Sequence, residues 1–349
     1  MASIYDTATL ARVVENLKQP GSFLLDMFFP NTITFDTEFV AIDVFNGKRR
    51  LAPFVNPLVE GKYVEQIGFT TNEYKPPHVK PKTRLDPLRP IRRMMGERIG
   101  GGDQTPVQRE AANLAFEMQS QVDMITRRCE WMAAQAMAFG SVTIVGDAYP
   151  QAVITFGRDS SLSVALAGAA RWGQPGVSPA QNIDDWSASV LQSSGFAVTD
   201  VVFTPLAWRA FRNDPMVAQI IASLSNGQPN FMAAGTPALN GGQFMGNWGT
   251  YRLWRYYEFY VDPVDGIEKP MLANGTVLLG SADIDGTRAF GAVIDPEVGY
   301  SAGSQAGGKV PYVPKSWLTH DPGARWLMTQ SAPLMIPTRV NASFAATVY

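Results

Sequence analysis

Two aspartates separated by a single residue, Asp283 and Asp285, follow a predicted strand over residues 276–282 and precede Gly286 and Thr287. In this arrangement one carboxylate can attack as a nucleophile, the other can act as general acid and base, and Mg²⁺ can bind between them. The same residue types are also typical of an Asx/Gly turn between two strands. The motif therefore has two interpretations, phosphoryl transfer or a plain turn.

An Asp-x-Asp-Gly-Thr motif after a strand resembles the phosphotransfer loop of haloacid-dehalogenase-type phosphatases. That resemblance implies a magnesium-dependent phosphatase in which Asp283 is the nucleophile and Asp285 the acid and base. We favour the turn, because the chain after the motif is too short for the rest of such an α/β domain. The phosphatase is kept as the alternative function.

The other reactive side chains are few and scattered. The chain has one cysteine, Cys129, and two histidines, His78 and His320. One cysteine excludes an internal disulfide and a cysteine-based zinc site. Cys129 falls on an apolar helical stripe, where a buried thiol behaves as a small hydrophobe. His320 and its neighbour Asp321 would point apart on a strand, so they do not form a catalytic pair. We expect no catalytic residue, no metal and no cofactor.

Composition predicts an ordinary globular protein. The 349 residues carry a net charge of -2 and are 46% hydrophobic, which predicts roughly two domains with a sizeable core. The 31 glycines and 25 prolines predict many turns and irregular connections. No stretch is long and apolar enough to span a membrane, and the first residues lack the features of a secretory signal. We expect a soluble protein made in a reducing cytoplasm, without a membrane partner.

The longest predicted element is a helix over residues 106–139, in which apolar residues recur every three or four positions. Thr105 is the expected N-cap, Gln108 completes a capping box, and Gly140 ends the helix. Thirty-four residues at 1.5 Å each give about 50 Å. This length predicts an elongated subunit built on a helical spine.

Residues 1–36 are expected to form an arm. Its apolar stretch around Phe28 and Phe29 is unusual near a chain end and is interpreted as a contact with a neighbouring subunit. After a strand-like alternation that begins at residue 37, Asn46-Gly47 predicts a two-residue hairpin turn. Residues 100–102, three glycines, form a joint that is either a fixed hinge or a flexible loop.

Residues 75–98 are strongly basic, with eight cationic and two acidic side chains for a local charge of +6. Five prolines exclude a regular helix there, so we expect an extended loop projecting from the body. The charge favours an acidic face of a protein partner over nucleic acid. The candidate contact residues in this loop and after the first hairpin turn are Lys48, Arg49, Arg50, Lys80, Lys82, Arg89, Arg92 and Arg93.

Beyond the long helix the pattern is mixed. Strands are predicted at 141–145 and 151–156, and the Gly- and Pro-rich stretch 168–180 predicts a domain boundary. Helical and strand-like segments alternate after that boundary. Residues 225–250 are rich in Gly and Asn, and no regular element is predicted there.

The last quarter of the chain carries the most specific pattern, Val-Pro-Lys-Ser-Trp-Leu-Thr at 313–319 and Met-Thr-Gln-Ser-Ala-Pro-Leu-Met at 328–335. This region resembles the C-terminal region of the major capsid proteins of lambda-type tailed phages. Residues 55–61, 78–82 and 288–291 are similar to the same family, in the same order. Residues 225–250 match it poorly and are interpreted as a variable surface loop.

The resemblance implies an α+β chain with the Hong Kong 97-like capsid fold. Its expected parts are an N-terminal arm (1–36), an extended β-hairpin loop (37–98), a peripheral domain (99–175) with spine helix 106–139, an axial domain (176–325), and a C-terminal strand returning to the peripheral domain (326–349). The Asp283 motif falls on an axial-domain turn in this scheme.

The function implied by the resemblance is structural and not enzymatic. Subunits are expected to assemble into pentamers and hexamers of an icosahedral phage head that encloses double-stranded DNA, with a precursor shell that expands on maturation. The implied partners are other copies of the chain, scaffold, portal and decoration proteins, and packaged DNA held without sequence specificity. The implied location is the virion capsid, assembled in the host cytoplasm.

Overall fold

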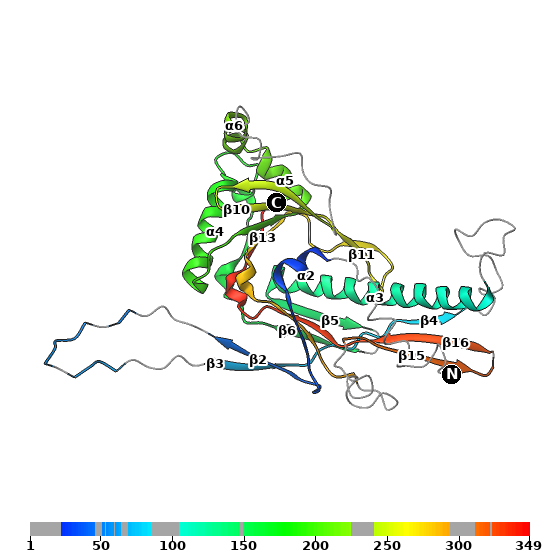
Figure 1. Cartoon of the computed structure of the whole chain (residues 1–349). Helices are drawn as coiled ribbons and strands as arrows, with labels where there is room; N and C mark the ends of the chain where they lie inside the picture. Colours follow the sequence, from blue (N-terminus) through cyan, green and yellow to red (C-terminus); the bar gives the residue numbers. More distant parts are fainter. Residues whose placement is uncertain are drawn as a thin grey trace.

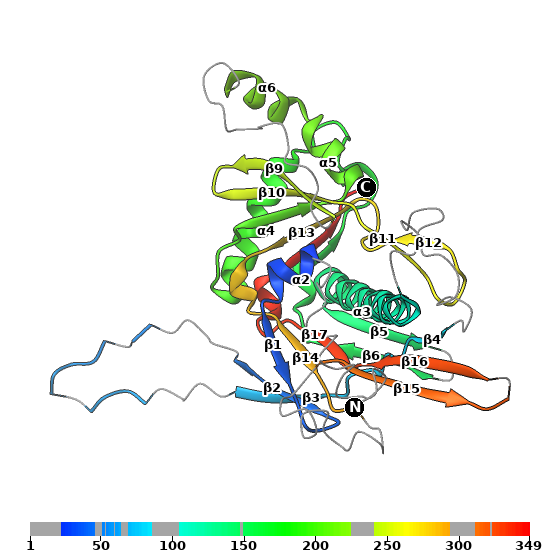
Figure 2. The same cartoon turned by 45° about the vertical axis from the view of Figure 1, so that its right-hand side comes forward.

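A computed structural model describes residues 22–45, 51–52, 54–58, 60–63, 69–85, 105–146, 149–224, 241–293, 311–321 and 323–349. One long helix, α3, crosses the middle of the molecule in Figure 1. A six-stranded sheet with its helices lies on one side of α3, and most of the smaller sheets lie on the other. A two-stranded hairpin projects away from the body in both Figure 1 and Figure 2.

Helix α3 runs from Pro106 to Phe139, the bounds that its sequence predicts. The Thr105 hydroxyl accepts a hydrogen bond from the Gln108 backbone N–H, while the Gln108 side chain accepts one from the Thr105 N–H. This reciprocal pair satisfies two of the donors that every helix start leaves without a partner. Gly140 ends the helix at φ 65°, a left-handed conformation that glycine adopts without a steric penalty.

The last turn of α3 is fixed by a side chain from outside the helix. Arg158 donates hydrogen bonds to the carbonyl oxygens of Met137 and Ala138, at 2.6 and 2.7 Å. These carbonyls have no partner within the helix, so the guanidinium satisfies them and its charge suits the negative end of the helix dipole. Burial lowers the pKa of Arg158 to about 10, which leaves it cationic at neutral pH.

The six-stranded sheet has the spatial order β7 (Ser163–Ala165), β18 (Phe344–Thr347), β13 (Thr276–Gly280), β8 (Asp200–Phe203), β10 (Tyr251–Tyr256) and β9 (Gly242–Trp248). Helices α4 (Pro179–Ser194), α5 (Pro205–Arg212) and α6 (Pro215–Leu224) accompany it. Helices α3, α4 and α5 each begin with proline, whose missing N–H costs nothing at the first helical position.

Side-chain alternation along the strands of this sheet divides the core into two clusters. Val201 and Phe203 of β8 pack with the side chains of α4 and α5, in a cluster that includes stacked Trp172 and Trp186. Val202 points to the other face and joins the cluster built around α3. Both faces of the sheet are therefore covered by buried side chains in this region. The sheet lies between the two core clusters and packs against both.

The smaller sheets contain the remaining strands. They pair β1 (Asn31–Thr34) with β14 (Thr287–Phe290) and β17 (Pro333–Ile336), β15 (Val313–Thr319) with β16 (Ala324–Gln330) and β4 (Lys82–Leu85), β2 (Val40–Phe45) with β3 (Phe69–Tyr74), β5 (Ser141–Gly146) with β6 (Tyr149–Thr155), and β11 (Phe259–Val261) with β12 (Glu268–Pro270). The short helices are α2 (Phe23–Phe28), η1 (Ser160–Leu162), η2 (Gly168–Ala170), η3 (Ala282–Ile284) and η4 (Val340–Ala342).

The C-terminal segment does not simply return to the part of the molecule around α3. Strand β18 lies inside the six-stranded sheet between β7 and β13. Conversely, β15 falls within the predicted axial range 176–325 but pairs with β16 and β4. Strands from distant parts of the chain therefore interleave in both sheets, while the boundaries at 176, 325 and 326 stay predictions.

Two predictions about the middle of the chain are wrong. Phe45, the last residue of β2, pairs with Phe69 of β3, so β2 and β3 are not joined by the two-residue turn that Asn46-Gly47 predicts. The interval 225–250 does contain an element, β9, which pairs antiparallel with β10. Glycine and asparagine conceal it, because these residues are depleted in strands.

The basic stretch 75–98 does not project as a whole. Pro76 and Pro77 are buried, Val79 exchanges backbone hydrogen bonds with Ser331, and β4 pairs with β16. The predicted arm start 1–21, the basic residues 86–99 and the glycines 100–102 lie outside the described residues. Within the described ranges, no helix has both the length and the apolar character needed to cross a membrane.

Candidate assembly surfaces

The projecting β2–β3 hairpin carries exposed apolar side chains in its distal part. Leu51, Phe54, Leu58 and Tyr63 have exposed fractions of 97, 106, 95 and 84%. Large apolar side chains grouped at such exposure mark a surface that another molecule covers. The hairpin is therefore the first candidate for contact between subunits.

A cross-strand ion pair closes the base of this hairpin, and an aromatic contact attaches it to the body. Lys75 forms an ion pair with Glu38, which lowers the pKa of that carboxyl group, and the Lys75 Nζ lies 5.9 Å from the centre of the Phe39 ring. Tyr74 makes an edge contact with Phe156, with ring centres 5.6 Å apart. The base is thus anchored, and the distal part of the hairpin extends from a fixed position.

Two of the predicted basic contact residues lie in the described part of the chain. Lys80 and Lys82 are both exposed. The Lys82 Nζ lies 4.0 Å from the centre of the Trp326 ring and 5.1 Å from that of Trp317, a cation–π arrangement within the subunit. The positions that lie outside the described residues are Lys48, Arg49, Arg50, Arg89, Arg92 and Arg93.

Phe28 and Phe29, which are predicted to contact another subunit, are both fully buried in the subunit's own core. Their pocket depends on glycine: a methyl group at Gly286 would lie 2.3 Å from the Phe28 carbonyl oxygen and 2.6 Å from the Phe29 ring. The Gly286 N–H donates to that carbonyl at 3.1 Å. Leu24, Leu25, Phe28 and Phe29 are part of the core, whereas β1, which pairs parallel with β14, is mostly exposed.

A buried carboxylate attaches α2 to the rest of the molecule. Glu130 of α3 is 3% exposed, and its Oε1 accepts hydrogen bonds from the Leu24 N–H at 3.0 Å and the Tyr256 hydroxyl at 2.9 Å. Its Oε2 accepts one from the Leu25 N–H at 3.0 Å. Burial raises the pKa of Glu130 to about 7, although these three donors lower it. The group joins the arm, the long helix and strand β10.

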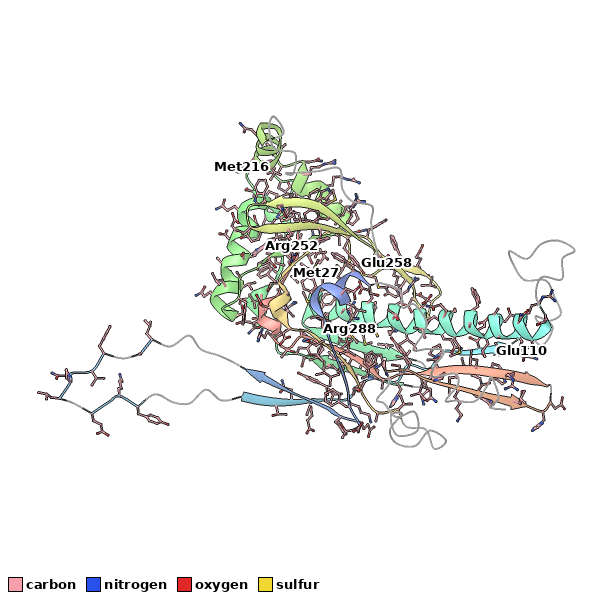
Figure 3. The ribbon with its side chains drawn as sticks, viewed as in Figure 1. Met27, Glu110, Met216, Arg252, Glu258 and Arg288 are labelled. Atoms are coloured by element: carbon pink, nitrogen blue, oxygen red, sulfur yellow. The ribbon has the colours of Figure 1, made fainter. Side chains whose placement is uncertain are left out.

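Arg288 of β14 provides a second attachment for α2, and Figure 3 shows it near Met27 at this junction. Its Nε donates to the Phe29 carbonyl at 2.7 Å, and its Nη2 forms an ion pair with Asp26 at 2.8 Å. The cation thus sits at the end of α2, where free carbonyl groups carry partial negative charge. Sequence reasoning missed both Glu130 and Arg288. For Glu130, the available sequence signal was a charged residue at a position within the apolar spacing of the long helix.

The Asp283 motif forms a turn, as the favoured interpretation predicts. Asp283 lies in η3, where its backbone N–H donates to the Ser281 hydroxyl. Asp285 adopts a left-handed conformation with φ 52°, and its Oδ1 accepts a hydrogen bond from the Asn31 side chain at 2.7 Å. Among the described residues, no group of three or more His, Cys, Asp or Glu side chains is placed to hold a metal ion.

The remaining reactive side chains lie apart from one another. His320 and Asp321 are exposed in the turn between β15 and β16. Cys129 is buried on α3, and burial raises the pKa of its thiol to about 12, so it is protonated at neutral pH. His78 is half-buried, and burial is the main cause that lowers its pKa. These placements bring together no nucleophile and base.

Comparison with known proteins connects this architecture to a family. The sequence model described as phage major capsid protein E matches residues 6–348, nearly the whole chain. The chain belongs to this family. The major capsid protein of Escherichia phage N15 is 29% identical over 338 residues, with 96% of each chain covered. That of Escherichia phage lambda is 28% identical over 335 residues, again with 96% of each chain covered.

Solved structures of the family's fold agree. A crystal structure assigned to the capsid protein of a prophage in E. coli CFT073 superposes with a TM-score of 0.74 at 20% identity, over 99% of both chains. The capsid of Ralstonia phage GP4 gives a TM-score of 0.51 at 11% identity, over 96% of this chain and 93% of that one. The chain has the α+β Hong Kong 97-like capsid fold. The family is structural, and none of these similarities supports the phosphatase alternative.

Proposed function

We propose that this chain is the shell-forming subunit of a tailed-phage head, assembling into pentamers and hexamers of an icosahedral capsid around double-stranded DNA. Family membership and the named relatives support this function. The observation that carries it is the distal part of the β2–β3 hairpin, where Leu51, Phe54, Leu58 and Tyr63 are held away from the subunit's own core. A second copy of the chain is the cover that such a hairpin needs.

The energy of such a contact is modest for each subunit and large for a shell. Burying one Leu or Phe side chain stabilises an interface by roughly 1.5–3 kcal/mol. Four apolar side chains therefore supply a useful contact, against the cost of ordering the loop and losing translational freedom. Because every subunit repeats the contact by symmetry, a closed shell accumulates it many times.

The basic residues add the expected polar part of this contact. Lys80, and the cationic positions from Lys48 to Arg50 and from Arg89 to Arg93, meet carboxylates of adjacent subunits in this scheme. Expansion of a precursor shell on maturation would exchange some of these pairs for others. Scaffold, portal and decoration proteins are the further partners, packaged DNA is contacted without sequence specificity, and assembly takes place in the host cytoplasm before the chain becomes part of the virion.

Electron microscopy and analytical ultracentrifugation of the expressed chain test this function. The wild type should form closed shells or capsomers, whereas a Phe54→Ser, Leu58→Ser double variant should remain a folded, unassembled subunit. The control Leu191→Ser also removes an exposed leucine, 42% exposed on α4, and should still assemble. A wild type that stays monomeric at high concentration, or a double variant that forms normal shells, would contradict the proposal.

A further inference from the structure

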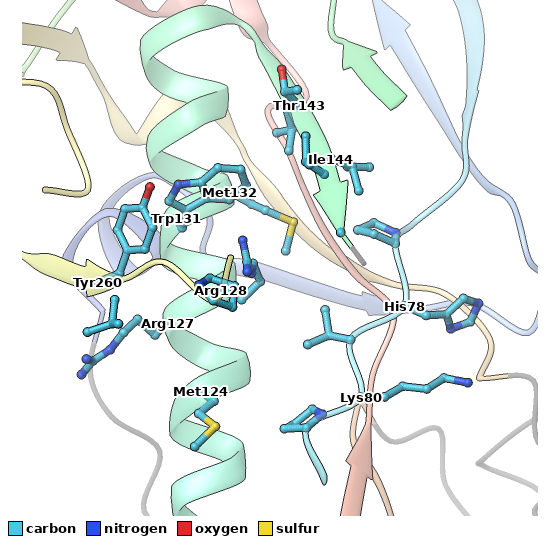
Figure 4. A pocket seen from close by; sticks show the side chains of 18 residues that line it. His78, Lys80, Met124, Arg127, Arg128, Trp131, Met132, Thr143, Ile144 and Tyr260 are labelled. Atoms are coloured by element: carbon cyan, nitrogen blue, oxygen red, sulfur yellow. The ribbon is translucent and has the colours of Figure 1, made fainter. Parts of the chain in front are cut away.

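A groove of about 610 Å³ lies between α3, β5, β11 and the extended segment Pro77–Pro81 (Figure 4). Its walls are mostly apolar and include Trp131 and Met132 of α3, Ile144 of β5 and Tyr260 of β11. Trp131 and Tyr260 meet edge to face, with ring centres 6.4 Å apart. The groove thus has walls in which two aromatic rings pack against each other, and a volume that can hold a few side chains of a ligand.

Apolar side chains are also exposed around this groove. Met124, Val145 and Val261 line it, with exposed fractions of 55, 58 and 61%. Together with the apolar walls they form one continuous surface rather than single scattered residues. Contiguous apolar surface of this kind is typical of a protein-binding site.

The charged side chains that line the groove are all cationic. Asp262 lies between the lining residues Val261 and Pro263, where Arg128 contributes to lowering the pKa of its carboxyl group, but this carboxylate is already paired with Lys269 at 2.6 Å. Arg127 and Arg128 line it, and the lining residues include neither aspartate nor glutamate. The Arg128 guanidinium lies 5.1 Å from the centre of the Trp131 ring, which holds it in place. In the described part of the chain, neither arginine has a hydrogen-bond or ion-pair partner. The side chains of His78 and Lys80 lie on the side of their segment away from α3 (Figure 4), so the two arginines set the charge.

We propose that this groove binds a segment of a different protein, one that carries carboxylates next to apolar side chains. Each guanidinium group offers a planar pair of donors that matches carboxylate geometry, and the apolar walls accept the neighbouring side chains. Both features are complete within one subunit, so the inference goes beyond shell formation and does not depend on it.

Charge argues against a second copy of this chain as the occupant. The exposed apolar residues of the hairpin lie within residues 46–63, which contain Lys48, Arg49, Arg50 and Lys62 but only one carboxylate, Glu60, for a net charge of +3. Such a segment would be repelled by Arg127 and Arg128 at short range. We therefore expect the hairpin to bind a surface other than this groove, and the groove to bind an acidic partner.

Fluorescence anisotropy of the unassembled subunit with labelled peptides tests the proposal. The probe is an eight-residue fluorescein-labelled peptide of alternating leucine and glutamate. Two matched peptides replace glutamate by lysine or leucine by serine. The subunit variants are Arg127→Glu, Arg128→Glu together, and Arg171→Glu as a control for an exposed arginine elsewhere.

The leucine–glutamate peptide should bind the wild type and the Arg171 variant equally, and at least tenfold more weakly to the Arg127, Arg128 double variant. The leucine–lysine peptide should show the reverse preference, which a misfolded variant would not produce. The serine–glutamate peptide should bind at least tenfold more weakly than the leucine–glutamate peptide. Absence of binding to the wild type, equal binding to the double variant, or equal binding of the serine–glutamate peptide would overturn the proposal. The proposal would also be overturned if the Arg127, Arg128 double variant differed from the wild type only in self-association of the subunit and not in peptide binding.

Discussion

Replacing Glu130 by glutamine should remove a specific part of the pH dependence of subunit stability. In the wild type the carboxyl group is buried among the Leu24 and Leu25 amides and the Tyr256 hydroxyl, and its pKa is raised to about 7 from 4.5. Asp26, itself paired with Arg288, is the nearby charge that adds to this rise. Glutamine keeps the shape of the side chain but does not ionise.

The sign and the size follow from proton binding. Between about pH 4.5 and pH 7 the folded subunit keeps a proton on Glu130 that the unfolded chain releases. The unfolding free energy therefore contains a contribution that is fully present below pH 4.5 and is lost as the pH rises to about 7. At about 1.4 kcal/mol for each pKa unit, the loss is about 3 kcal/mol.

Urea unfolding of the unassembled subunit at a series of pH values measures this contribution. The difference in unfolding free energy between wild type and Glu130→Gln should fall by about 3 kcal/mol across the window. The exposed carboxyl group of Glu268 provides the matched control, and Glu268→Gln should follow the wild-type profile. Tyr256→Phe removes a donor that lowers the pKa of Glu130, so the wild-type fall should extend to higher pH in that variant.

Parallel profiles for the wild type and Glu130→Gln would refute this reasoning, because they would show that Glu130 has the same proton affinity in both states. A difference that grows with pH would also refute it. That result would mean that the hydrogen bonds hold the ionised form more strongly than burial disfavours it. The Tyr256→Phe profile separates these outcomes from a general loss of packing.

Two further changes test the packing around the arm and the end of the long helix. Gly286→Ala should lower the unfolding free energy by about 1–3 kcal/mol, because the added methyl group meets the Phe28 carbonyl oxygen. Gly323→Ala, which meets nothing within 4 Å, should leave the urea midpoint unchanged, and an equal effect of both would contradict the packing argument. Arg158→Met should cost about 2 kcal/mol, because two helix carbonyls lose their donors. A wild-type urea midpoint for this variant would show that water replaces the guanidinium at no cost.

The long helix could be predicted in detail because its signals are local. Thr105, Gln108 and Gly140 each act within one turn of the residues they cap, so sequence spacing alone defines both ends. The family pattern was also readable, since the 313–319 and 328–335 motifs are contiguous. Capping residues and contiguous motifs can both be recognised in a sequence without knowledge of tertiary contacts.

The failures concern contacts between distant residues. The buried position of Phe28 depends on Gly286, and the attachment of α2 depends on Glu130, more than one hundred residues away in the chain. Apolar residues near a chain end look the same whether they pack on their own subunit or on another. For the hairpin, the strand partner of Phe45 is Phe69, and the nearer Asn46-Gly47 signal concealed it. The exposure of Leu51, Phe54 and Leu58 has no local sequence signal, because an apolar residue in a loop has the same sequence context whether it is buried or exposed.

The interleaving of β18 between β7 and β13 has a consequence for the timing of synthesis. The sheet lacks an internal strand until residues Phe344–Thr347 have been synthesised, so the cores on its two faces cannot close before then. Entry of β18 between β7 and β13 is then the step that completes both cores. A chain without Phe344–Thr347 would leave the facing edges of β7 and β13 unpaired and apolar side chains of both clusters uncovered, and exposed edges and apolar surface of this kind promote aggregation.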